Sequence, residues 1–354
     1  MRRRPETVTD SDSHLRMTAT TAHHDPIDHR VAAYLRRTSV TDATRVERLH
    51  GDASNRAYFR VTRRQSPSLV LAVHPEPFDA STLRQLVVGE LFDRLAIPIP
   101  ATCGHAGDLG VLALEDLGPD TLQDWQDIAE RDPAPLYREA TDFIVRLQQT
   151  SSPGREPAPP PFDIAFDHAT LTRELTFFRT EFLGAYRRLT LSAIQSHALD
   201  EEFASIAEDL AAEPRVLCHR DYHSRNLMVQ HQRLVVIDFQ DARMGPDTYD
   251  LVSLLRDCYV DLAPELVTEM TNRFLAARPR ARRDRFHPRF DLMSVQRHLK
   301  ALGTFGHQIA VAERPAFASA LPRTLGHLRG ALHAHDRFAR LLELLTPHLP
   351  ELRR

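Results

Sequence analysis

Two polar runs joined by an apolar stretch constrain this chain more than any other feature. Between residues 216 and 251 the sequence reads VLCHRDYHSRNLMVQHQRLVVIDFQDARMGPDTYDL. Asp221 is followed five positions later by Asn226, and the short apolar strand RLVVID ends at Asp238. Because a short hairpin brings the loops at its two ends together, these three side chains are expected at one place.

A carboxylate, an amide and a second carboxylate are the groups that phosphoryl transfer needs at such a place. One carboxylate orients the acceptor hydroxyl and takes its proton. An amide oxygen and another carboxylate hold magnesium against nucleotide phosphates, because hard divalent cations prefer oxygen ligands. The segment is therefore typical of a phosphoryl-transfer site.

The rest of the chain predicts an α+β protein. Residues 45–115 give strand, turn, strand, turn and strand, with turn residues in GDASN and RRQSPS. The segment DASTLRQLVVGELFDRLAIPIP predicts a helix with Asp79 as N-cap, Pro98 as stop and Glu90 on the apolar stripe. Later helices are expected at 135–149, 168–189, 195–211, 247–276, 287–312 and 320–345.

This pattern divides the chain into three parts. Residues 1–28 are expected to be a disordered tail. Residues 29–115 are expected to form an N-lobe, made of a small antiparallel sheet and one helix. Residues 116–354 are expected to form a larger, mainly helical C-lobe that carries the catalytic loop and the acceptor site.

Composition excludes several classes of function. The formal net charge is −3, which gives no basic excess for nucleic acid or a membrane surface. The three cysteines form no CxxC pair, so neither a disulfide framework nor a zinc site is indicated. No apolar run reaches 18 residues, and the basic N-terminus has no apolar segment behind it. We expect a cytoplasmic protein with no membrane contact and no obligate protein partner.

Several sequence motifs resemble those of a known family. The runs CHRDYHSRN and VIDFQDARMGPDTYDLVSLLRDCY resemble the aminoglycoside phosphotransferase and choline kinase superfamily. Within it, the likeness is to the bacterial N-acetylmuramate/N-acetylglucosamine anomeric kinases, and it continues in QRHLKALGTFGHQ and ALPRTLGHL. The resemblance implies a bilobal protein-kinase-like fold. It also implies ATP-dependent phosphorylation of the C1 hydroxyl of these sugars, with Mg²⁺, in cell-wall sugar recycling.

The resemblance assigns roles around the catalytic loop. It implies that Asp221 is the general base and that Asn226 and Asp238 are the magnesium ligands. His219 would brace the loop from behind, and Asp250 would pin it from the start of the next helix.

The resemblance also implies a nucleotide site, with one departure from the general pattern. Ser54 and Asn55 of the GDASN turn would cover the phosphates, and the hinge strand with Glu115 and Leu117 would pair with and enclose adenine. Kinases place a lysine on the third strand, paired with a helix glutamate. Here that strand, SLVLAVHPEP, has no lysine, because the only lysine is Lys300.

Other side chains are therefore expected to replace the missing charge. Glu90 occupies the expected glutamate position without its usual partner. Arg56 or Arg60 would then contact the phosphates, and His74 is a weaker candidate.

The acceptor is less constrained by the sequence. His223, Arg225, Gln240 and Asp241 are the expected substrate-binding residues, although His223 is equally compatible with loop packing. Their mixed charges suit a neutral or anionic sugar better than a cation. An aminoglycoside, choline or homoserine acceptor stays open, as does a non-catalytic kinase-like protein that only binds nucleotide.

Overall fold

The computed structural model describes residues 26–49, 56–128, 130–154, 157–278, 283 and 285–353. Ser54 and Asn55 lie outside these residues, as does most of the expected tail. The chain divides into two compact units. The first holds Met1–Thr82 and Pro100–Asp116, and the second holds Leu83–Ile99 and Leu117–Arg354.

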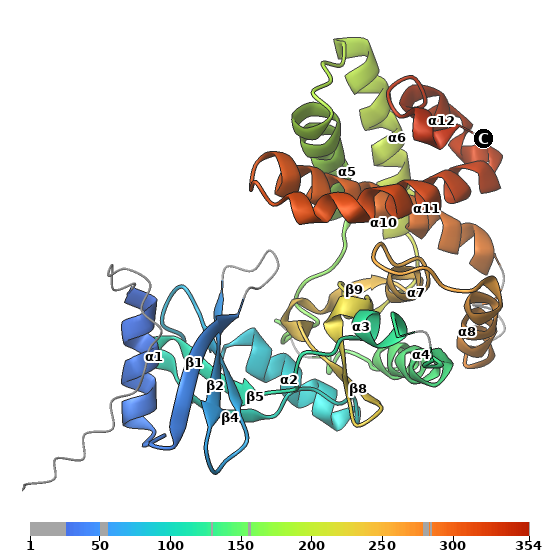
Figure 1. Ribbon diagram of the computed structural model, residues 1–354. Coiled ribbons are helices and arrows are strands. Elements are labelled where there is room, and N and C mark those ends of the chain that lie inside the picture. The colour runs from blue at the N-terminus through green and yellow to red at the C-terminus, as the bar shows by residue number, and fades with distance from the viewer. Residues whose placement is uncertain are drawn as a thin grey trace, which may run out of the picture. The chain divides into compact units, whose positions relative to one another are not determined.

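The first unit is built on a five-stranded antiparallel sheet, which confirms the predicted β-rich part. Its strand order is β1-β2-β3-β5-β4, and Figure 1 labels all of these strands except β3. The strands are β1 (Ala43–Leu49), β2 (Ala57–Arg63), β3 (Leu69–Val73), β4 (Thr102–Ala106) and β5 (Val111–Glu115). The central strand β3 is almost wholly buried, as expected for a run of Leu, Val and Ala with neighbours on both sides.

A helix that the sequence analysis did not predict packs on this sheet. Helix α1 (Pro26–Arg37) buries Val31, Tyr34 and Leu35 in the apolar cluster that the strands line. Its Arg30 donates hydrogen bonds to the carbonyl oxygens of Leu109 and His74, both at 2.6 Å. These bonds join α1 to the ends of the strands.

The second unit is mainly helical. Its long helices are α2 (Arg84–Arg94), α4 (Ala134–Gln148), α5 (His168–Phe177), α6 (Ala193–Ala211), α8 (Pro264–Ala276), α10 (Phe286–Ala310) and α11 (Leu321–Ala334). Its shorter helices are α3 (Leu122–Gln126), α7 (Tyr249–Leu255) and α12 (Ala339–Leu345). A π-helical turn, η2 (Phe178–Tyr186), follows directly on α5. The 3-10 turns are η1 (Gly107–Leu109) in the first unit and η3 (Ser224–Asn226), η4 (Phe239–Asp241), η5 (Pro315–Ala320), η6 (Asp336–Phe338) and η7 (Pro350–Leu352) in the second.

Two predicted helices are each divided in the structure. The helix expected at 247–276 is interrupted between α7 and α8, where Pro264 occupies the first turn of α8. Proline lacks the backbone N–H that a continuing helix needs, and it fits the first helical position. The helix expected at 320–345 ends at Ala334, because His335 is extended.

Helix α2 also differs from its prediction. The side chain of Asp79 accepts hydrogen bonds from the backbone N and the hydroxyl of Ser81, so it forms a local turn and α2 begins only at Arg84. The buried face of α2 includes Val88 and Phe92, whereas Glu90 is exposed. The expectation that Glu90 lies on the apolar stripe is therefore wrong. The compact units also group α2 with the second unit rather than with the sheet.

Two small strand pairs carry the loops that the sequence singled out. Strand β6 (Arg215–Cys218) pairs with β9 (Arg243–Pro246). Strand β7 (Leu227–Gln230) pairs with β8 (Arg233–Val236), in register Leu227↔Val236. The β7–β8 turn has His231 and Gln232 with φ of 50° and 60°. Two successive residues at positive φ are typical of the turn that suits the twist of a tight hairpin.

Helix α10 packs against α5, η2 and α11 (Figure 1). Two glycines allow a close approach to η2. A Cβ added at Gly303 would lie 2.9 Å from the backbone N of Phe178, and one at Gly306 would lie 2.8 Å from the carbonyl oxygen of Glu181. Since neither backbone can move aside cheaply, these glycines fix the position of α10 on η2. Among the described residues, no helix combines the length and apolarity needed to cross a membrane.

Candidate active site

The loop after β6 is held by one buried carboxylate. Asp250, in the first turn of α7, accepts a hydrogen bond from the backbone N of His219 at 2.7 Å and from that of Arg220 at 3.0 Å. Burial raises the pKa of Asp250, although the two amides oppose that shift. The ring Nε2 of His219 donates to the carbonyl oxygen of Ile237 at 3.0 Å. Asp250 therefore contacts the backbone of the loop, and the ring of His219 joins the loop to the backbone at the end of β8.

Arg220 has an unusual backbone conformation next to the predicted base. Its φ is +89°, a value that L-residues adopt only at a cost of about 1–2 kcal/mol. The hydrogen bond from its backbone N to Asp250 stabilises this conformation. Its guanidinium lies 3.1 Å from Asp241 and 3.7 Å from Asp221.

Among the ion pairs of the described residues, Asp221 has the carboxylate with the most cations around it. Lys300 Nζ donates to its Oδ1 at 3.2 Å, and Arg297 Nη1 lies 3.8 Å from the same oxygen. Burial alone would raise the pKa of Asp221, but Lys300, Arg220 and Arg297 hold it well below its usual range. The carboxylate is therefore charged at neutral pH and can accept a hydrogen bond from a hydroxyl.

The hairpin brings Asn226 and Asp238 to the same end of β7 and β8. Asn226 precedes β7, and its carbonyl oxygen accepts from the backbone N of Ile237 at 3.0 Å, immediately before Asp238. The Nδ2 of Asn226 donates to the carbonyl oxygen of Asp221 at 2.8 Å. This bond uses the nitrogen end of the amide and leaves the oxygen end for another partner. Asp238 itself has a φ of 61°, which aspartate tolerates better than most residues.

These two side chains fit a magnesium ion that a nucleotide carries. Kinases usually hold Mg²⁺ by one or two protein side chains, completed by phosphate oxygens and water. One amide oxygen and one carboxylate at the same hairpin end supply such a set. Within the part of the chain that the structure describes, no group of three His, Cys, Asp or Glu residues could hold a metal ion by themselves.

The expected substrate residues differ in how they are engaged. The guanidinium of Arg225 stacks on Tyr259, 3.8 Å from the ring centroid, and donates to Gln123 at 2.8 Å. The ring of His223 also contacts Tyr259, with centroids 5.2 Å apart. Burial, opposed by Asp221 and aided by Arg297 and Lys300, lowers the pKa of His223 to about 3, so its ring is neutral.

Gln240 and Asp241 lie in η4, directly after Asp238. The Nε2 of Gln240 donates to Asp238 Oδ1 at 2.8 Å. The carboxylate of Asp241 pairs with Arg220, and Arg243 Nη2 lies 3.8 Å from it. Both residues therefore contact other members of the candidate site.

The predicted nucleotide residues of the first unit lie on β2, on β5 and just before β2. Arg60 is in an ion pair with Asp116 at 2.8 Å. Arg56 precedes β2, and the register Ala57↔Val73 places it opposite His74, the residue after β3. Burial, with Arg56 and Arg30, lowers the pKa of His74 to about 4. Glu115 accepts from the backbone N of Ala101 at 3.2 Å.

Two predicted nucleotide residues belong to the second unit. Leu117 is its first residue after the sheet and is partly exposed. Glu90 is on the exposed face of α2.

The candidate site includes residues that were not predicted. Lys300 and Arg297 reach Asp221 from α10, and Asp257 accepts from the backbone N of Ser224 at 2.7 Å. Lys300 and Arg297 occur in the run QRHLKALGTFGHQ, which carried part of the resemblance but had no role assigned. The rarity of lysine in this chain was the available signal.

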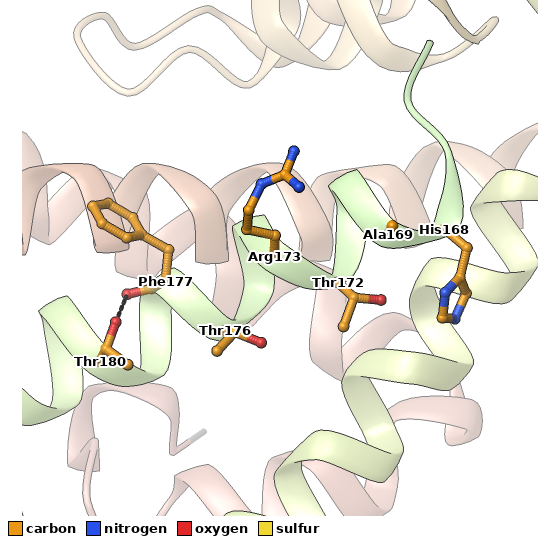
Figure 2. Close-up of a pocket in the computed structure, with 7 residues that line it drawn as sticks. All are labelled: His168, Ala169, Thr172, Arg173, Thr176, Phe177 and Thr180. Atoms are coloured by element: carbon orange, nitrogen blue, oxygen red, sulfur yellow. Dashed lines mark hydrogen bonds between the residues drawn. The ribbon is translucent and has the colours of Figure 1, made fainter.

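A separate hollow of about 440 Å³ runs along α5 and the start of η2. Figure 2 shows the side chain of Arg173 extending away from this helix, and the hydroxyl of Thr180 donating to the carbonyl oxygen of Phe177. None of the predicted site residues lines it.

The loop, the hairpin and the helical unit together define a phosphotransferase. The chain belongs to the family described as the phosphotransferase enzyme family, which it matches over residues 45–284. More particularly, it is 34% identical over 307 residues to the N-acetylmuramate/N-acetylglucosamine kinase of Neisseria meningitidis serogroup B, covering 83% of this chain and 88% of that protein. The protein of the same name from Caulobacter vibrioides is 30% identical, covering 82% and 88%.

Solved structures support the same fold. An ADP-bound aminoglycoside phosphotransferase superimposes with a TM-score of 0.59 at 12% identity, covering 88% of this chain and 98% of that one. A choline/ethanolamine kinase family protein from Mesorhizobium loti gives a TM-score of 0.58 at 17% identity, covering 92% and 99%. At these identities the likeness shows the fold alone. The predicted fold class, with its antiparallel sheet and mainly helical part, is confirmed.

Proposed function

We propose that this chain is an ATP-dependent kinase that phosphorylates the anomeric C1 hydroxyl of N-acetylmuramate, N-acetylglucosamine or both. The observation that carries the proposal is the meeting of Asp221 with Asn226 and the end of the β7–β8 hairpin. The names of relatives that match more than four-fifths of the chain support the choice of acceptor. A place in cell-wall sugar recycling, in the cytoplasm, is part of the proposal.

Asp221 would act as the base for the acceptor hydroxyl. Its carboxylate is charged, and a general base in phosphoryl transfer needs only hydrogen-bond reach of the hydroxyl whose proton it takes. As the hydroxyl oxygen attacks the γ-phosphorus, its proton passes to Asp221 and the bond to the ADP oxygen breaks. Catalysis of this kind comes mainly from orientation and from stabilisation of charge.

Asn226 and Asp238 would hold Mg²⁺, which supplies positive charge to the β- and γ-phosphates when bound. Gln240 donates to Asp238 Oδ1 and so orients that carboxylate. The main-chain bond between Asn226 and Ile237 keeps the two ligands in register. His219 and Asp250 would hold the loop that presents Asp221.

The nucleotide part of the proposal concerns other residues. The backbone of Glu115 and the side chain of Leu117 would pair with and enclose adenine. Ser54 and Asn55 would cover the phosphates. Arg56 is the better candidate for the missing lysine charge, because the pairing of β2 with β3 places it opposite His74, the residue that follows β3.

The charges around Asp221 indicate which kind of acceptor the site would favour. Lys300, Arg297 and Arg220 all lie within 4 Å of that carboxylate. A cationic acceptor such as choline or an aminoglycoside would be repelled there, whereas a neutral or anionic amino sugar would not. His223, Arg225, Gln240 and Asp241 are the proposed side chains around this acceptor.

An acceptor screen tests the proposal. The purified chain would be incubated with MgATP and N-acetylmuramate, N-acetylglucosamine, glucosamine, kanamycin, choline or homoserine, and ADP release would be measured. Phosphorus NMR of the product then identifies the phosphorylated carbon, because an anomeric phosphate couples to H1. ADP release with the two N-acetyl sugars and an anomeric product is expected. A 6-phosphate product would contradict the C1 assignment, and ATP binding without ADP release from any acceptor would favour a non-catalytic protein.

A further inference from the structure

The only lysine of the chain lies against the proposed base. Lys300 is on α10, and its Nζ donates to Asp221 Oδ1 at 3.2 Å across 79 positions of sequence. Its side chain is 16% exposed, so the contact is shielded from most of the solvent. A partly buried charge–charge hydrogen bond of this kind holds both side chains more firmly than a surface pair does.

The packing of α10 determines where this amine lies. One turn after Lys300, Gly303 lies against the backbone of Phe178, and Gly306 lies against that of Glu181. These contacts fix the helix, and Arg297, one turn before Lys300, faces the same carboxylate at 3.8 Å. The run QRHLKALGTFGHQ thus contains both the glycines that allow α10 to pack closely on η2 and the two cations, Arg297 and Lys300, that reach Asp221.

The two carboxylate oxygens of Asp221 have different cationic neighbours. Lys300 and Arg297 both approach Oδ1, whereas Oδ2 has Arg220 Nε at 3.7 Å, beyond hydrogen-bond distance. Arg220 is itself closer to Asp241, at 3.1 Å. The contact with α10 therefore fixes the rotation of the carboxylate about χ2 and directs its second oxygen elsewhere.

A structural ion pair would match one cation with one anion. Around Asp221 three cations share a single carboxylate, and only Arg220 has a second acidic partner among the ion pairs of the described residues. Asp221 is therefore held by more cationic contacts than a single ion pair would supply.

We propose that Lys300 is a positioning residue for phosphoryl transfer, which holds Asp221 Oδ1 so that Oδ2 faces the acceptor hydroxyl. This inference rests on the proposed function. Lys300 acts through Asp221, and its loss misaligns the carboxylate while the nucleotide contacts stay in place.

The kinetic test compares Lys300→Met, Lys300→Gln and Lys300→Arg with the control Arg273→Met. Arg273 makes a bidentate ion pair with Asp142 between α8 and α4, so its loss removes a cation without touching the site. We expect Lys300→Met and Lys300→Gln to lower kcat about 10- to 100-fold, the size of effect that misplacement by about 1 Å produces, with the KM for ATP unchanged. Lys300→Arg should recover part of the loss, and Arg273→Met should match the wild type within about twofold.

A double-variant cycle with Asp221→Asn separates positioning from a direct effect. If Lys300 acts through Asp221, Lys300→Met should cost little in the Asp221→Asn background, because effects of groups that act as one unit are not additive. An undiminished kcat in Lys300→Met, or an equal loss in both backgrounds, would overturn the inference.

A measurement independent of turnover uses the fact that there is one lysine. Protein labelled with lysine carrying ¹⁵N at Nζ gives a single side-chain ammonium signal, which Asp221→Asn should shift and Arg273→Met should not. An unchanged signal in Asp221→Asn would refute the contact. The kinetic assays use whichever acceptor releases ADP from the wild type, so a different alcohol would refute the proposed sugar while still testing Lys300.

Discussion

Asp250 accepts a hydrogen bond from the backbone N of Arg220, a residue held at a φ of +89°. The other oxygen of the same buried carboxylate accepts from His219. One side chain of α7 therefore stabilises a strained turn directly before the proposed base. The turn depends on a contact from another element and not on glycine.

Replacing Asp250 by Asn should weaken both the fold and the activity. One of the two amides would face an NH₂ group and lose its acceptor, at a cost of about 1–3 kcal/mol in the free energy of unfolding. The turn would also relax, so kcat should fall at least about tenfold. Urea unfolding and steady-state kinetics measure the two effects. Asp209→Asn, which removes only an exposed pair with Arg337, is the control, and equal behaviour of the two variants would contradict this account.

Replacing a glycine by alanine should lower the free energy of unfolding at Gly303 in α10 but raise it at Gly330 in α11. A methyl group at Gly303 would lie within 3 Å of the backbone of Phe178, so Gly303→Ala should destabilise the fold by about 1–3 kcal/mol. At Gly330, inside α11, an added Cβ meets nothing within 4 Å. Gly330→Ala should therefore stabilise by about 0.5–1 kcal/mol, from helix propensity alone. Urea midpoints measured side by side test the pair, and two variants shifted in the same direction would refute the packing argument.

Acid should destabilise the contact between α10 and α11 through two histidines. Burial lowers the pKa of His298 to about 3, and burial, with Arg256, lowers that of His327 to about 4. In the unfolded chain both rings would titrate near 6.5. The unfolded state therefore binds more protons below that value, and stability that is complete above it is lost as the pH falls toward 4.

One variant can check how much stability is lost at acid pH. For His298 alone the loss at pH 5 is on the order of 2 kcal/mol. Gln at this position keeps a side-chain donor for the carbonyl oxygen of Arg256, which His298 Nε2 contacts at 2.9 Å, but does not titrate. We expect the Tm of the wild type to drop by several degrees between pH 7.5 and pH 5, and that of His298→Gln to drop less. Parallel curves for the two proteins would be the contrary outcome.

The two arginines near the missing lysine should differ in their effect on ATP. Arg56→Ala should raise the KM for ATP about tenfold, since a charge-assisted phosphate contact is worth about 1.5–3 kcal/mol. Arg60→Ala should act less on KM and more on stability, because it removes an ion pair with Asp116, whose side chain is only 9% exposed. Nucleotide KM and thermal midpoints for both variants decide between them. If the KM for ATP is unchanged in both variants, neither arginine contacts the phosphates.

The sequence predicted the parts of the candidate site that are local. Asp221, Asn226 and Asp238 lie within 18 positions, and short apolar strands flank them, so hairpin geometry predicts that they lie close together. The structure shows Asn226 bonded to the backbone of Asp221 and to that of Ile237, the residue before Asp238. The contact of Asp250 with the loop was also expected, because a carboxylate suits the first turn of a helix.

Long-range contacts could not be read in the same way. Lys300 meets Asp221 only because α10 packs on η2, and no local pattern reports which residues of one helix will face a loop 79 positions earlier. Glu90 was placed on the wrong face for a related reason. Leu86, Val87 and Val88 form an apolar run compatible with two registers, and packing against Phe239 selected the face that contains Val88 and Phe92.

The turn at His231 and Gln232 sits at the far end of the β7–β8 hairpin from Asn226 and Asp238. A slip of one residue in the pairing would invert every side chain beyond it, so one donor would face the opposite side. The spacing of the proposed metal ligands is consequently encoded in two residues that take no part in the chemistry. Insertions or deletions there should abolish turnover as completely as loss of a ligand, whereas same-length replacements that keep the turn should be silent.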